Sequence, residues 1–369
     1  MSEGPLHGIR VLELLGIGPG PFAGMMLADL GADVLALRRP GQVPGGGGLE
    51  RGRPVAGVNL KDTVTADVVR GLLPSVDVLI EGYRPGVAER LGLGPQDCHA
   101  VNPRLVYGRM TGWGQTGPLA TTAGHDINYI AVTGALHAAT RHGQPPTPPA
   151  NLLGDFGGGG MYLVTAVLAA LVERAHTGTG RVLDVAITDG TTYLTSMLYG
   201  MHRDGQWRDE AGTNLLDTGA PYYDVYECAD GRHVAIGALE PQFFAALADL
   251  LGLAPEVRAD RDDPARWPAL REAITAAVLT RTRDEWAALA TGTDACLTPV
   301  LNLSEAPRHG QALARDIFAG GMPRLPLGHA TTVASAADVV RAWGVNPELA
   351  DAVAQWPSAS ALDRGIAHA

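Results

Sequence analysis

The sequence predicts an α/β fold that combines a large domain, built on a doubly wound parallel sheet, with a smaller α+β domain. Between residues 8 and 187, short apolar segments alternate with helical patterns, as a parallel sheet requires. Beyond about residue 222, a hairpin pattern is followed by consecutive helices, which is typical of an α+β domain. The 369 residues are enough for two such domains.

The first unit of the alternation is a strand over residues 8–13, a helix over 22–30 and a second strand over 32–37. Glycines between the first strand and the helix suggest a dinucleotide site. Pro21, however, stands where the third glycine of that motif belongs, and Arg38 stands where an acidic residue would bind the ribose. The sequence therefore supports a dinucleotide site only weakly.

Five more elements continue the same alternation. The loops at 82–84 and 108–117 follow predicted strands, and ligands bind beyond the carboxyl ends of parallel strands in such folds. The elements are a helix over 62–73, a strand over 76–81, a short helix over 87–91, and strands over 105–110 and 181–187.

A Gly-rich segment over residues 38–61 is the most basic part of an acidic chain. Two interpretations remain open for it, a solvated loop or a site for phosphate or adenine. Lys61 is the only lysine of the chain. The basic residues of the segment are Arg38, Arg39, Arg51, Arg53 and Lys61.

The stretch over residues 124–176 contains the strongest candidates for acid–base chemistry. His125 stands beside an aspartate, and Asp155 is followed closely by four glycines and an apolar helix pattern over 161–174. That pattern indicates a core helix, too short and too interrupted by polar residues to span a membrane. An acidic residue before Gly-rich backbone at a helix start suggests an anion site, but Asp155 as a helix N-cap and His125 as a core histidine are simpler interpretations.

The smaller domain is predicted from a change of pattern after a long linker over residues 213–223. Ala229, Asp230 and Gly231 join two short strands in a hairpin. The predicted elements are a helix over 189–205, strands over 223–228 and 233–237, helices over 241–251, 267–279 and 284–291, a strand over 296–301 and a tail helix over 336–343.

Composition limits the class of protein. The net charge of −11 argues against nucleic-acid binding, although a local basic cluster could still bind a phosphate. Cys98, Cys228 and Cys296 lie far apart without CxxC spacing, which favours a reducing compartment and argues against a zinc site or a disulfide framework. Residues 1–8 show no signal-peptide pattern, so we expect a cytoplasmic protein with no metal and no membrane association.

Longer motifs make a more specific match than any of these patterns. The chain resembles the α-methylacyl-CoA racemases of the class III, formyl-CoA transferase type, CoA-transferase superfamily. The motifs that carry the resemblance are LHGIRVLEL, LGADVLALRRP, EGYRPGVAERLGLGP, RMTGWGQTGP, GHDINYI, NLLGDFGGGG, GAPYYDVYECADGRHVAIGALEPQF and TDACLTPVL.

The resemblance implies an interlocked homodimer whose active site lies between the large domain of one chain and the small domain of the other. The large CoA-binding domain would cover residues 1–190, joined by the C-terminal segment 325–369. A linker over 191–221 would lead to the small domain and return linker over 222–324.

The resemblance also implies 1,1-proton transfer beside the thioester of an acyl-CoA, without a cofactor. His125, supported by Glu240, would serve one face of the substrate and Asp155 the other, because inversion needs two groups in opposite protonation states. The enolate oxygen would bind N–H groups at a helix start after Asp155. The implied CoA contacts are Arg39, Val58, Asn59, Leu60, Lys61, Gly82, Tyr83, Arg84, Arg90, Gly124, Asp126, Ile127, Asn128 and Tyr129.

Two other functions are compatible with the same residues. In a class III CoA-transferase, the aspartate equivalent to Asp155 is a nucleophile, but those enzymes usually carry an aromatic residue where this chain has His125. A non-catalytic acyl-CoA-binding protein would be expected to have lost one of the acid–base groups. The chain departs from the racemase pattern in its short, Gly-rich segment over 41–53 and in Arg38, where an acidic or polar residue is expected. The identity of the acyl chain stays open.

Overall fold

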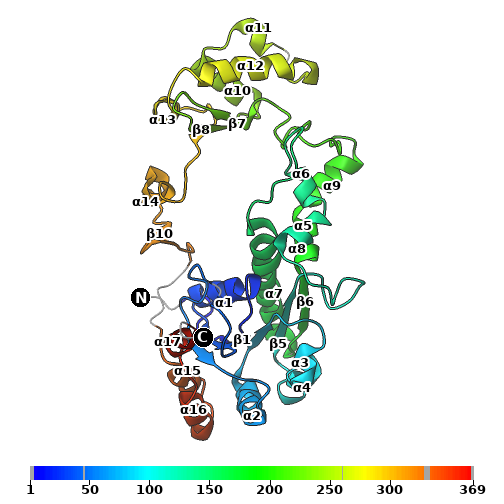
Figure 1. The fold of residues 1–369 in the computed structure, drawn as a ribbon, viewed down its shortest axis with the longest axis vertical. Coiled ribbons are helices and arrows are strands. Elements are labelled where there is room, and N and C mark those ends of the chain that lie inside the picture. The colour runs from blue at the N-terminus through cyan, green and yellow to red at the C-terminus, as the bar shows by residue number, and fades with distance from the viewer. Residues whose placement is uncertain (1–3, 45, 260, 328–332, 367–369) are drawn as a thin grey trace. The chain divides into compact units, whose positions relative to one another are not determined.

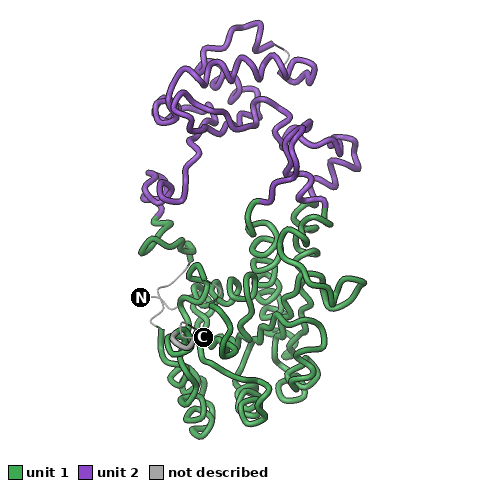
Figure 2. Tube along the Cα trace, in the orientation of Figure 1, with its two compact units in different colours: residues 1–133, 149–195, 316–369 green, residues 134–148, 196–315 purple. Residues whose placement is uncertain are grey.

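The computed structural model describes residues 4–44, 46–259, 261–327 and 333–366. These residues form two compact units (Figure 2): unit 1 comprises 1–133, 149–195 and 316–369, and unit 2 comprises 134–148 and 196–315. Residues 134–148 thus cluster with the second unit, although the sequence placed them in the large domain. Gly45 of the Gly-rich segment and residues 328–332 and 367–369 of the predicted C-terminal segment lie outside the described residues.

Unit 1 is built on a six-stranded sheet, of which β1, β5 and β6 are labelled in Figure 1. Every pairing in it is parallel, and the strand order is β3-β2-β1-β4-β5-β6. The chain moves outward from β1 to β3 and then returns to the other side of β1, which creates a topological switch point between β1 and β4. This confirms the doubly wound α/β fold. The strands are β1 (Arg10–Leu14), β2 (Asp33–Arg38), β3 (Val55–Gly57), β4 (Val78–Glu81), β5 (Val106–Thr111) and β6 (Val182–Ala186).

Each face of the sheet packs into its own hydrophobic core, because side chains alternate along a strand. In β1, Val11 belongs to the core under α1 (Pro19–Asp29) and α7 (Tyr162–Thr177), whereas Leu12 belongs to the opposite core. Trp343, which is 2% exposed, packs into that opposite core. The helices and turns that contribute residues there are α2 (Thr63–Leu72), η1 (Leu73–Ser75), α4 (Pro95–Val101), α15 (Ala336–Ala342) and α16 (Pro347–Ala354).

Several elements of unit 1 were not predicted. The strand β3 lies inside the segment that we interpreted as a connection, and its three residues are too few to show an alternation. The helix α4 begins with Pro95 and has a single buried residue, Cys98, so its sequence shows no apolar stripe. The helices α16 and α17 (Ala359–Ile366) were missed in a tail rich in alanine.

The Gly-rich stretch around Asp155 is helical, and our prediction of a helix that begins near Met161 was wrong. A π-helical segment, η2 (Leu152–Met161), continues without a break into α7. The 26 continuous residues are long and apolar enough to cross a membrane, so the sequence prediction on length was also wrong. Leu163, Val164 and Val167 of this helix are nevertheless buried in the core of unit 1, as in a core helix of a globular protein.

Unit 2 contains the predicted hairpin, in a sheet of order β7-β8-β9 (β7 Tyr223–Glu227, β8 His233–Gly237, β9 Leu297–Pro299). The predicted helix over 189–205 is interrupted at Thr195, giving α8 (Ile187–Leu194) in unit 1 and α9 (Ser196–Arg203) in unit 2.

The other helices of unit 2 are α6 (Ala135–Ala138), α10 (Pro241–Leu251), α11 (Pro255–Arg258), η3 (Pro264–Arg266), α12 (Trp267–Val278), α13 (Arg283–Ala290), η4 (Ala306–Arg308) and α14 (Gly310–Ala314). Those of unit 1 not yet given are α3 (Val87–Arg90) and α5 (Asp126–Ala131), and β10 (Phe318–Ala319) and β11 (Met322–Pro323) form a two-stranded ribbon.

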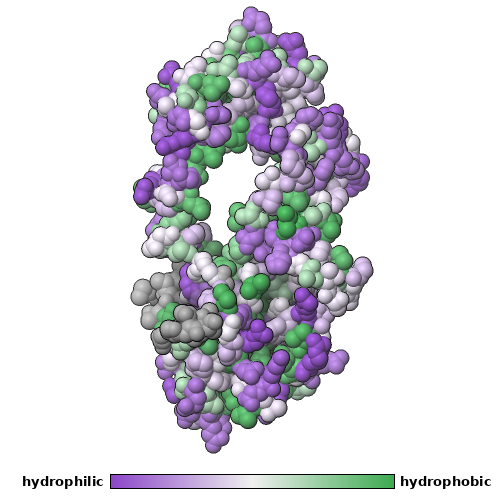
Figure 3. All heavy atoms as spheres, viewed as in Figure 1, coloured by the Kyte–Doolittle hydropathy of each residue, from purple (hydrophilic) through white to green (hydrophobic). Residues whose placement is uncertain are grey.

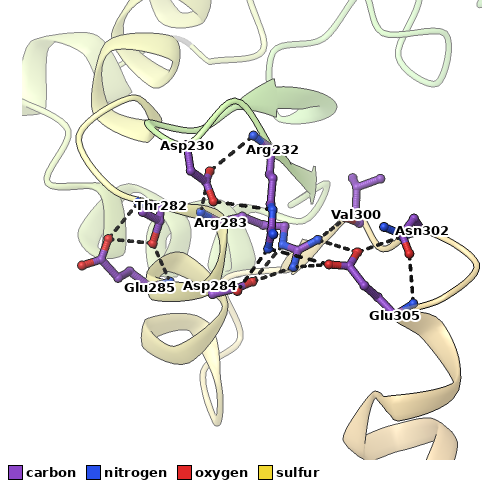
Figure 4. Close-up of polar contacts among 9 residues, drawn as sticks. All are labelled: Asp230, Arg232, Thr282, Arg283, Asp284, Glu285, Val300, Asn302 and Glu305. Carbon is purple, nitrogen blue, oxygen red and sulfur yellow. Dashed lines mark hydrogen bonds and ion pairs between the residues drawn. The ribbon is translucent and has the colours of Figure 1, made fainter.

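A network of charged side chains ties the segment after β9 to the start of α13 (Figure 4). Arg283 is 5% exposed and donates from Nη1 and Nη2 to the two carboxylate oxygens of Glu305, each at 2.9 Å. Glu305 also accepts the N–H of Asn302 at 3.0 Å. These hydrogen bonds, led by those from Arg283, lower the pKa of Glu305 to about 2.

Because the folded-state pKa of Glu305 is depressed, its ion pair stabilises the protein above the usual glutamate pKa near 4.5 and is lost as the pH falls towards about 2. We therefore expect Glu305→Gln to be less stable than the wild type at pH 7, with a difference that shrinks between pH 4.5 and 2. Urea unfolding of unit 2, followed by hydrogen exchange of β8 and α13 at several pH values, measures this difference. Glu256→Gln, on exposed α11, is the control, and a pH-independent effect of Glu305→Gln would contradict the interpretation.

A buried ion pair connects the Gly-rich segment to the centre of the sheet. Arg53 donates from Nε to Glu13 Oε2 at 2.7 Å, and the two side chains are 0% and 1% exposed. Burial raises the pKa of Glu13, although Arg53 opposes this shift. The energetic cost of burying the carboxylate is therefore large, and Glu13 depends on its partner.

Removal of this partner should strongly destabilise unit 1. Because Arg53→Ala leaves Glu13 buried without its ion pair, we expect a loss of about 3–5 kcal/mol in the free energy of unfolding. The matched control is Arg51→Ala, which breaks a more exposed pair with Asp29 and should cost less than about 1 kcal/mol. Urea unfolding followed by hydrogen exchange of β1 and β2 measures both values, and equal losses would contradict the assignment.

Candidate active site

A cavity of about 720 Å³ lies within unit 1 at the carboxyl ends of the parallel strands. Gly18 follows β1, Gly82 follows β4, Gly112 follows β5 and Ile187 follows β6, and all four line the cavity. This is the position expected for a ligand beside the switch point of a doubly wound sheet. Besides the loops after these strands, the lining includes residues 46, 47, 49, 120, 122–125, 129, 151, 155 and 156.

His125 reaches this cavity from the N-cap position of α5. Its backbone N–H donates to Asn128 Oδ1 at 3.1 Å, and its carbonyl accepts the N–H of Asn128 at 2.8 Å. Its backbone is extended and it is exposed, so the ring is not buried in the core. The alternative of a satisfied core histidine is therefore wrong.

Two aromatic side chains, Tyr129 and Trp113, line the same cavity as His125. Tyr129 donates from its hydroxyl to the carbonyl of Gly124, the residue before His125. The Tyr129 ring meets Trp113 edge-to-face, with 4.8 Å between the ring centroids. A side chain at Gly124 would lie 2.8 Å from the Tyr129 ring, so only glycine allows this approach. These contacts fix the backbone that presents His125.

Asp155 lines the same cavity from inside the first turn of η2. The N-cap of this helix is Asn151, so the interpretation of Asp155 as a helix N-cap is wrong. Asn151 donates from Nδ2 to Asp155 Oδ2 at 3.3 Å, and the N–H of Asp155 donates to Asp126 Oδ2 at 2.6 Å. Opposite, Gly18 has a positive φ of 68°, and a Cβ there would lie 3.0 Å from Asp155 Oδ2.

Burial raises the pKa of the Asp155 carboxyl above its ordinary value. The hydrogen bond from Asn151 opposes this shift, the charge of Asp126 reinforces it, and His125 opposes it weakly. The net direction favours the protonated form more than in an ordinary aspartate. Asp155 is therefore electrostatically suited to hold and return a proton.

The glycines after Asp155 serve packing and are not a row of free donors. In a π-helix each N–H bonds to the carbonyl five residues back, and Phe156 N–H already bonds to Asn151 at 3.3 Å. Because the helix starts at Leu152, the expectation of free N–H groups at a helix start after Asp155 is wrong. A Cβ at Gly158 would lie 2.3 Å from Thr191 Oγ1 of α8, and one at Gly160 would lie 2.6 Å from Phe22 of α1.

Of the residues with an implied contact to CoA, five line the cavity, and the others lie elsewhere in unit 1. The lining residues are Gly82, Tyr83, Arg84, Gly124 and Tyr129. Exposed residues outside the lining are Arg39, Asn59, Lys61, Arg90, Ile127 and Asn128, while Leu60 is half-buried. Val58 is 3% exposed in the core and Asp126 is 7% exposed, so neither presents a free side chain to solvent.

A buried carboxylate holds the loop after β4. Glu81 Oε2 accepts the N–H of Tyr83 at 2.7 Å, and Glu81 Oε1 accepts Arg109 Nε at 2.9 Å. The side chain of Glu81 is 0% exposed, and burial raises its pKa despite these bonds. Because Glu81 fixes Tyr83, it also fixes the start of the loop that carries Arg84 into the cavity.

The sequence analysis missed several residues of the cavity. Asn151 precedes Asp155 by one helical turn, a spacing that would have suggested a contact if the helix start had been placed correctly. Phe156 and Trp113 line the wall, but an aromatic residue in a loop gives no sequence signal of its own. Gly46 and Gly47 also line the cavity, so the Gly-rich segment contributes backbone to it.

Glu240 lies in unit 2, at the exposed N-cap of α10. The residues before α10 are held by Arg261, which donates from Nη2 to Leu239 O at 2.7 Å and stacks over Tyr222 at 4.7 Å from the ring centroid. The role of Glu240 beside His125 stays a prediction. Among the described residues, no group of three or more His, Cys, Asp or Glu side chains could hold a metal ion.

Comparison with known proteins finds likeness over most of the chain. The chain is 43% identical to the α-methylacyl-CoA racemase of Mus musculus over 87% of this chain and 84% of that protein. It is 42% identical to the α-methylacyl-CoA racemase of Homo sapiens over 85% of this chain and 82% of that protein. The crystal structure of the hypothetical protein Rv3272 from Mycobacterium tuberculosis has a TM-score of 0.73 and 26% identity over 90% of this chain and 95% of that chain.

A family model matches almost as widely. The model described as CoA-transferase family III covers residues 6–338. The motifs on which the resemblance rests fall within this range, as do all the cavity residues and Glu240. The chain belongs to CoA-transferase family III.

Proposed function

We propose that the chain is an α-methylacyl-CoA racemase, an isomerase that interconverts the (2R) and (2S) forms of 2-methylacyl-CoA thioesters. The observation that carries this proposal is that His125 and Asp155 line one cavity at the carboxyl ends of the parallel strands. The 43% identity to the mouse racemase supports the same reaction.

The proposed reaction is a 1,1-proton transfer through an enolate. Neutral His125 takes the C2 proton from one face of the thioester, and the protonated carboxyl of Asp155 returns a proton to the other face. The reverse reaction starts with ionised Asp155 and protonated His125. The raised pKa of Asp155 supports this pairing, because the carboxyl must carry a proton for half of the reaction. Both steps use side chains only, so we propose no cofactor and no metal.

The CoA moiety is proposed to lie along the loops at the same edge of the sheet. Arg84 lies in the cavity wall, and Arg39 and Lys61 are exposed close after the carboxyl ends of β2 and β3. Cations at these positions suit the phosphates of CoA. The remaining proposed contacts are Val58, Asn59, Leu60, Gly82, Tyr83, Arg90, Gly124, Asp126, Ile127, Asn128 and Tyr129, of which Val58 and Asp126 could contribute only backbone.

We also propose a homodimer in which Glu240 of the partner subunit supports His125. Large apolar side chains reach the surface of unit 1 (Figure 3), and the proposed dimer would bury some of them. The large apolar residues exposed on α5, η2, α7 and α8 are Ile127, Leu152, Met161, Tyr162, Val172, Tyr193 and Leu194. A cytoplasmic location and a place in lipid metabolism complete the proposal.

A CoA-transferase is the second candidate, because the family includes transferases by name and Asp155 could act as a nucleophile. Asp155 alone does not separate the two reactions, because proton transfer also uses its ionised form in one direction. A transferase mechanism does not require a histidine in this cavity, whereas proton transfer uses His125 as one of its two groups. The geometry therefore favours proton transfer over acyl transfer.

Deuterium exchange tests the reaction directly. In D₂O, the enzyme should incorporate deuterium at C2 of a 2-methylacyl-CoA of one configuration and lose its optical purity. Because each variant lacks one proton-transfer group, His125→Ala and Asp155→Asn should each lower racemisation by at least ~10²-fold. Binding of the CoA ester, measured by calorimetry, should survive in both.

Two matched controls accompany these variants. His176→Ala, on the exposed end of α7, and Asp184→Asn, on β6, lie outside the cavity and should keep wild-type rates. Full racemisation by Asp155→Asn would contradict the two-group mechanism. Acyl exchange between CoA and a free acid, with an anhydride trapped on Asp155 by hydroxylamine, would establish the transferase instead.

The proposed dimer has its own test. Sedimentation velocity should give twice the mass of one chain, and Met161→Glu should shift the protein towards a monomer, because a charge at a 52% exposed apolar site opposes burial. Val64→Glu, 69% exposed on α2, is the control and should leave the mass unchanged. A wild-type monomer at high concentration would refute the dimer.

A further inference from the structure

We propose that Asp126 is a positioning residue whose carboxylate holds Asp155 in register with His125. This inference rests on the proposed function of those two residues in proton transfer. The resemblance placed Asp126 among the CoA contacts, but the structure gives its side chain a different partner.

The contact is direct and buried. Asp126 is the first residue of α5 and follows His125 without a gap. Its Oδ2 accepts the backbone N–H of Asp155 at 2.6 Å, and the residue is only 7% exposed. The Asp126 side chain therefore connects the backbone of Asp155 to the residue that follows His125 in the chain.

Gly154 makes this contact possible. A Cβ at position 154 would lie 2.4 Å from Asp126 Oδ2 and 2.9 Å from Ile130 Cγ2 of the same helix. Any larger residue would therefore push the carboxylate away from the N–H of Asp155. Within the NLLGDFGGGG motif, the glycine before Asp155 and the four that follow thus have different tasks.

The second oxygen of Asp126 argues against a purely structural cap. Within the part of the chain that the structure describes, Oδ1 is buried and has no hydrogen-bond partner. A buried acceptor left unpaired is costly, and a fold that needed only a cap could use an asparagine. An ionised oxygen at this place supplies a charge beside Asp155 that a neutral side chain would not.

That charge acts on Asp155 in the direction that proton donation needs. Burial raises the pKa of Asp155 and the negative charge of Asp126 adds to it, while the Asn151 hydrogen bond and His125 oppose it. Tyr129 of α5 also interacts electrostatically with Asp155. Neutralising Asp126 while keeping its shape should therefore lower the pKa of Asp155.

The test compares Asp126→Asn with the wild type in the full-length protein. The amide oxygen can still accept the N–H of Asp155, so the fold is kept while the charge is lost. We expect the ¹³C titration of the Asp155 carboxyl to move to lower pH. The kcat for C2 proton exchange at neutral pH should fall by about 10- to 100-fold with KM unchanged. Asp184→Asn is the matched control, because Asp184 also accepts a backbone N–H, that of Gln115 at 3.1 Å, outside the cavity.

A second variant separates position from charge. Gly154→Ala keeps the charge of Asp126 but displaces its carboxylate, so it should also lower kcat while KM for the CoA ester stays constant. In the wild type, the amide proton of Asp155 should resonate downfield and exchange slowly, because it bonds to a buried carboxylate. Because this measurement uses the wild type, its result does not depend on whether a variant folds.

Several results would overturn the inference. One is an unchanged Asp155 titration and kcat in Asp126→Asn. Another is a rise in KM alone, which would assign the Asp126 side chain to CoA binding. A third is a rapidly exchanging Asp155 amide in the wild type. If the wild type exchanges no C2 proton, the proposed function fails. Even then, comparing the Asp155 titration in the substrate-free wild type with that in Asp126→Asn would show whether Asp126 raises the pKa of Asp155.

Discussion

The close packing of η2 against α1 and α8 is the constraint on which the site depends. Gly158 and Gly160 let the helix approach Thr191 and Phe22 within distances that a Cβ would forbid. A π-helical segment has a wider turn than an α-helix, and such segments are frequent at functional sites. In this chain the π-helical segment presents Asp155 to the cavity, and the same helix continues as α7 into the core.

The sheet explains why the other parts of the site meet that turn. Loops from four parallel strands line the cavity, and local polar contacts fix the backbone of three residues beside it. Glu81 holds the N–H of Tyr83, Asn128 holds the N–H of His125, and Asp126 holds the N–H of Asp155. In each case a side-chain oxygen accepts a backbone donor, which orders a loop without using the groups that face the cavity. Such preorganisation is what electrostatic catalysis requires.

The sequence alone predicted the parallel sheet, the hairpin of unit 2, and His125 and Asp155 in a common cavity. Those predictions rest on apolar periodicity and on long motifs, which do not depend on side-chain geometry. It failed for β3, which is too short to alternate, and for the start of η2, because a run of four glycines reads as a loop. It also failed for Asp126. The hydrogen bond between its buried carboxylate and the backbone N–H of Asp155 joins residues far apart in the sequence, so no spacing pattern predicts it.

The two aspartates illustrate how environment, rather than residue type, divides roles in this site. Both stand on helices that begin at the cavity, yet Asp126 is 7% exposed with one oxygen committed to a backbone donor, and Asp155 lines the open space. Burial raises the pKa of the Asp155 carboxyl, and the charge of Asp126 adds to this shift. The raised pKa of Asp155 eases the step in which this carboxyl donates a proton, whereas His125 in the same cavity is the residue that separates proton transfer from acyl transfer.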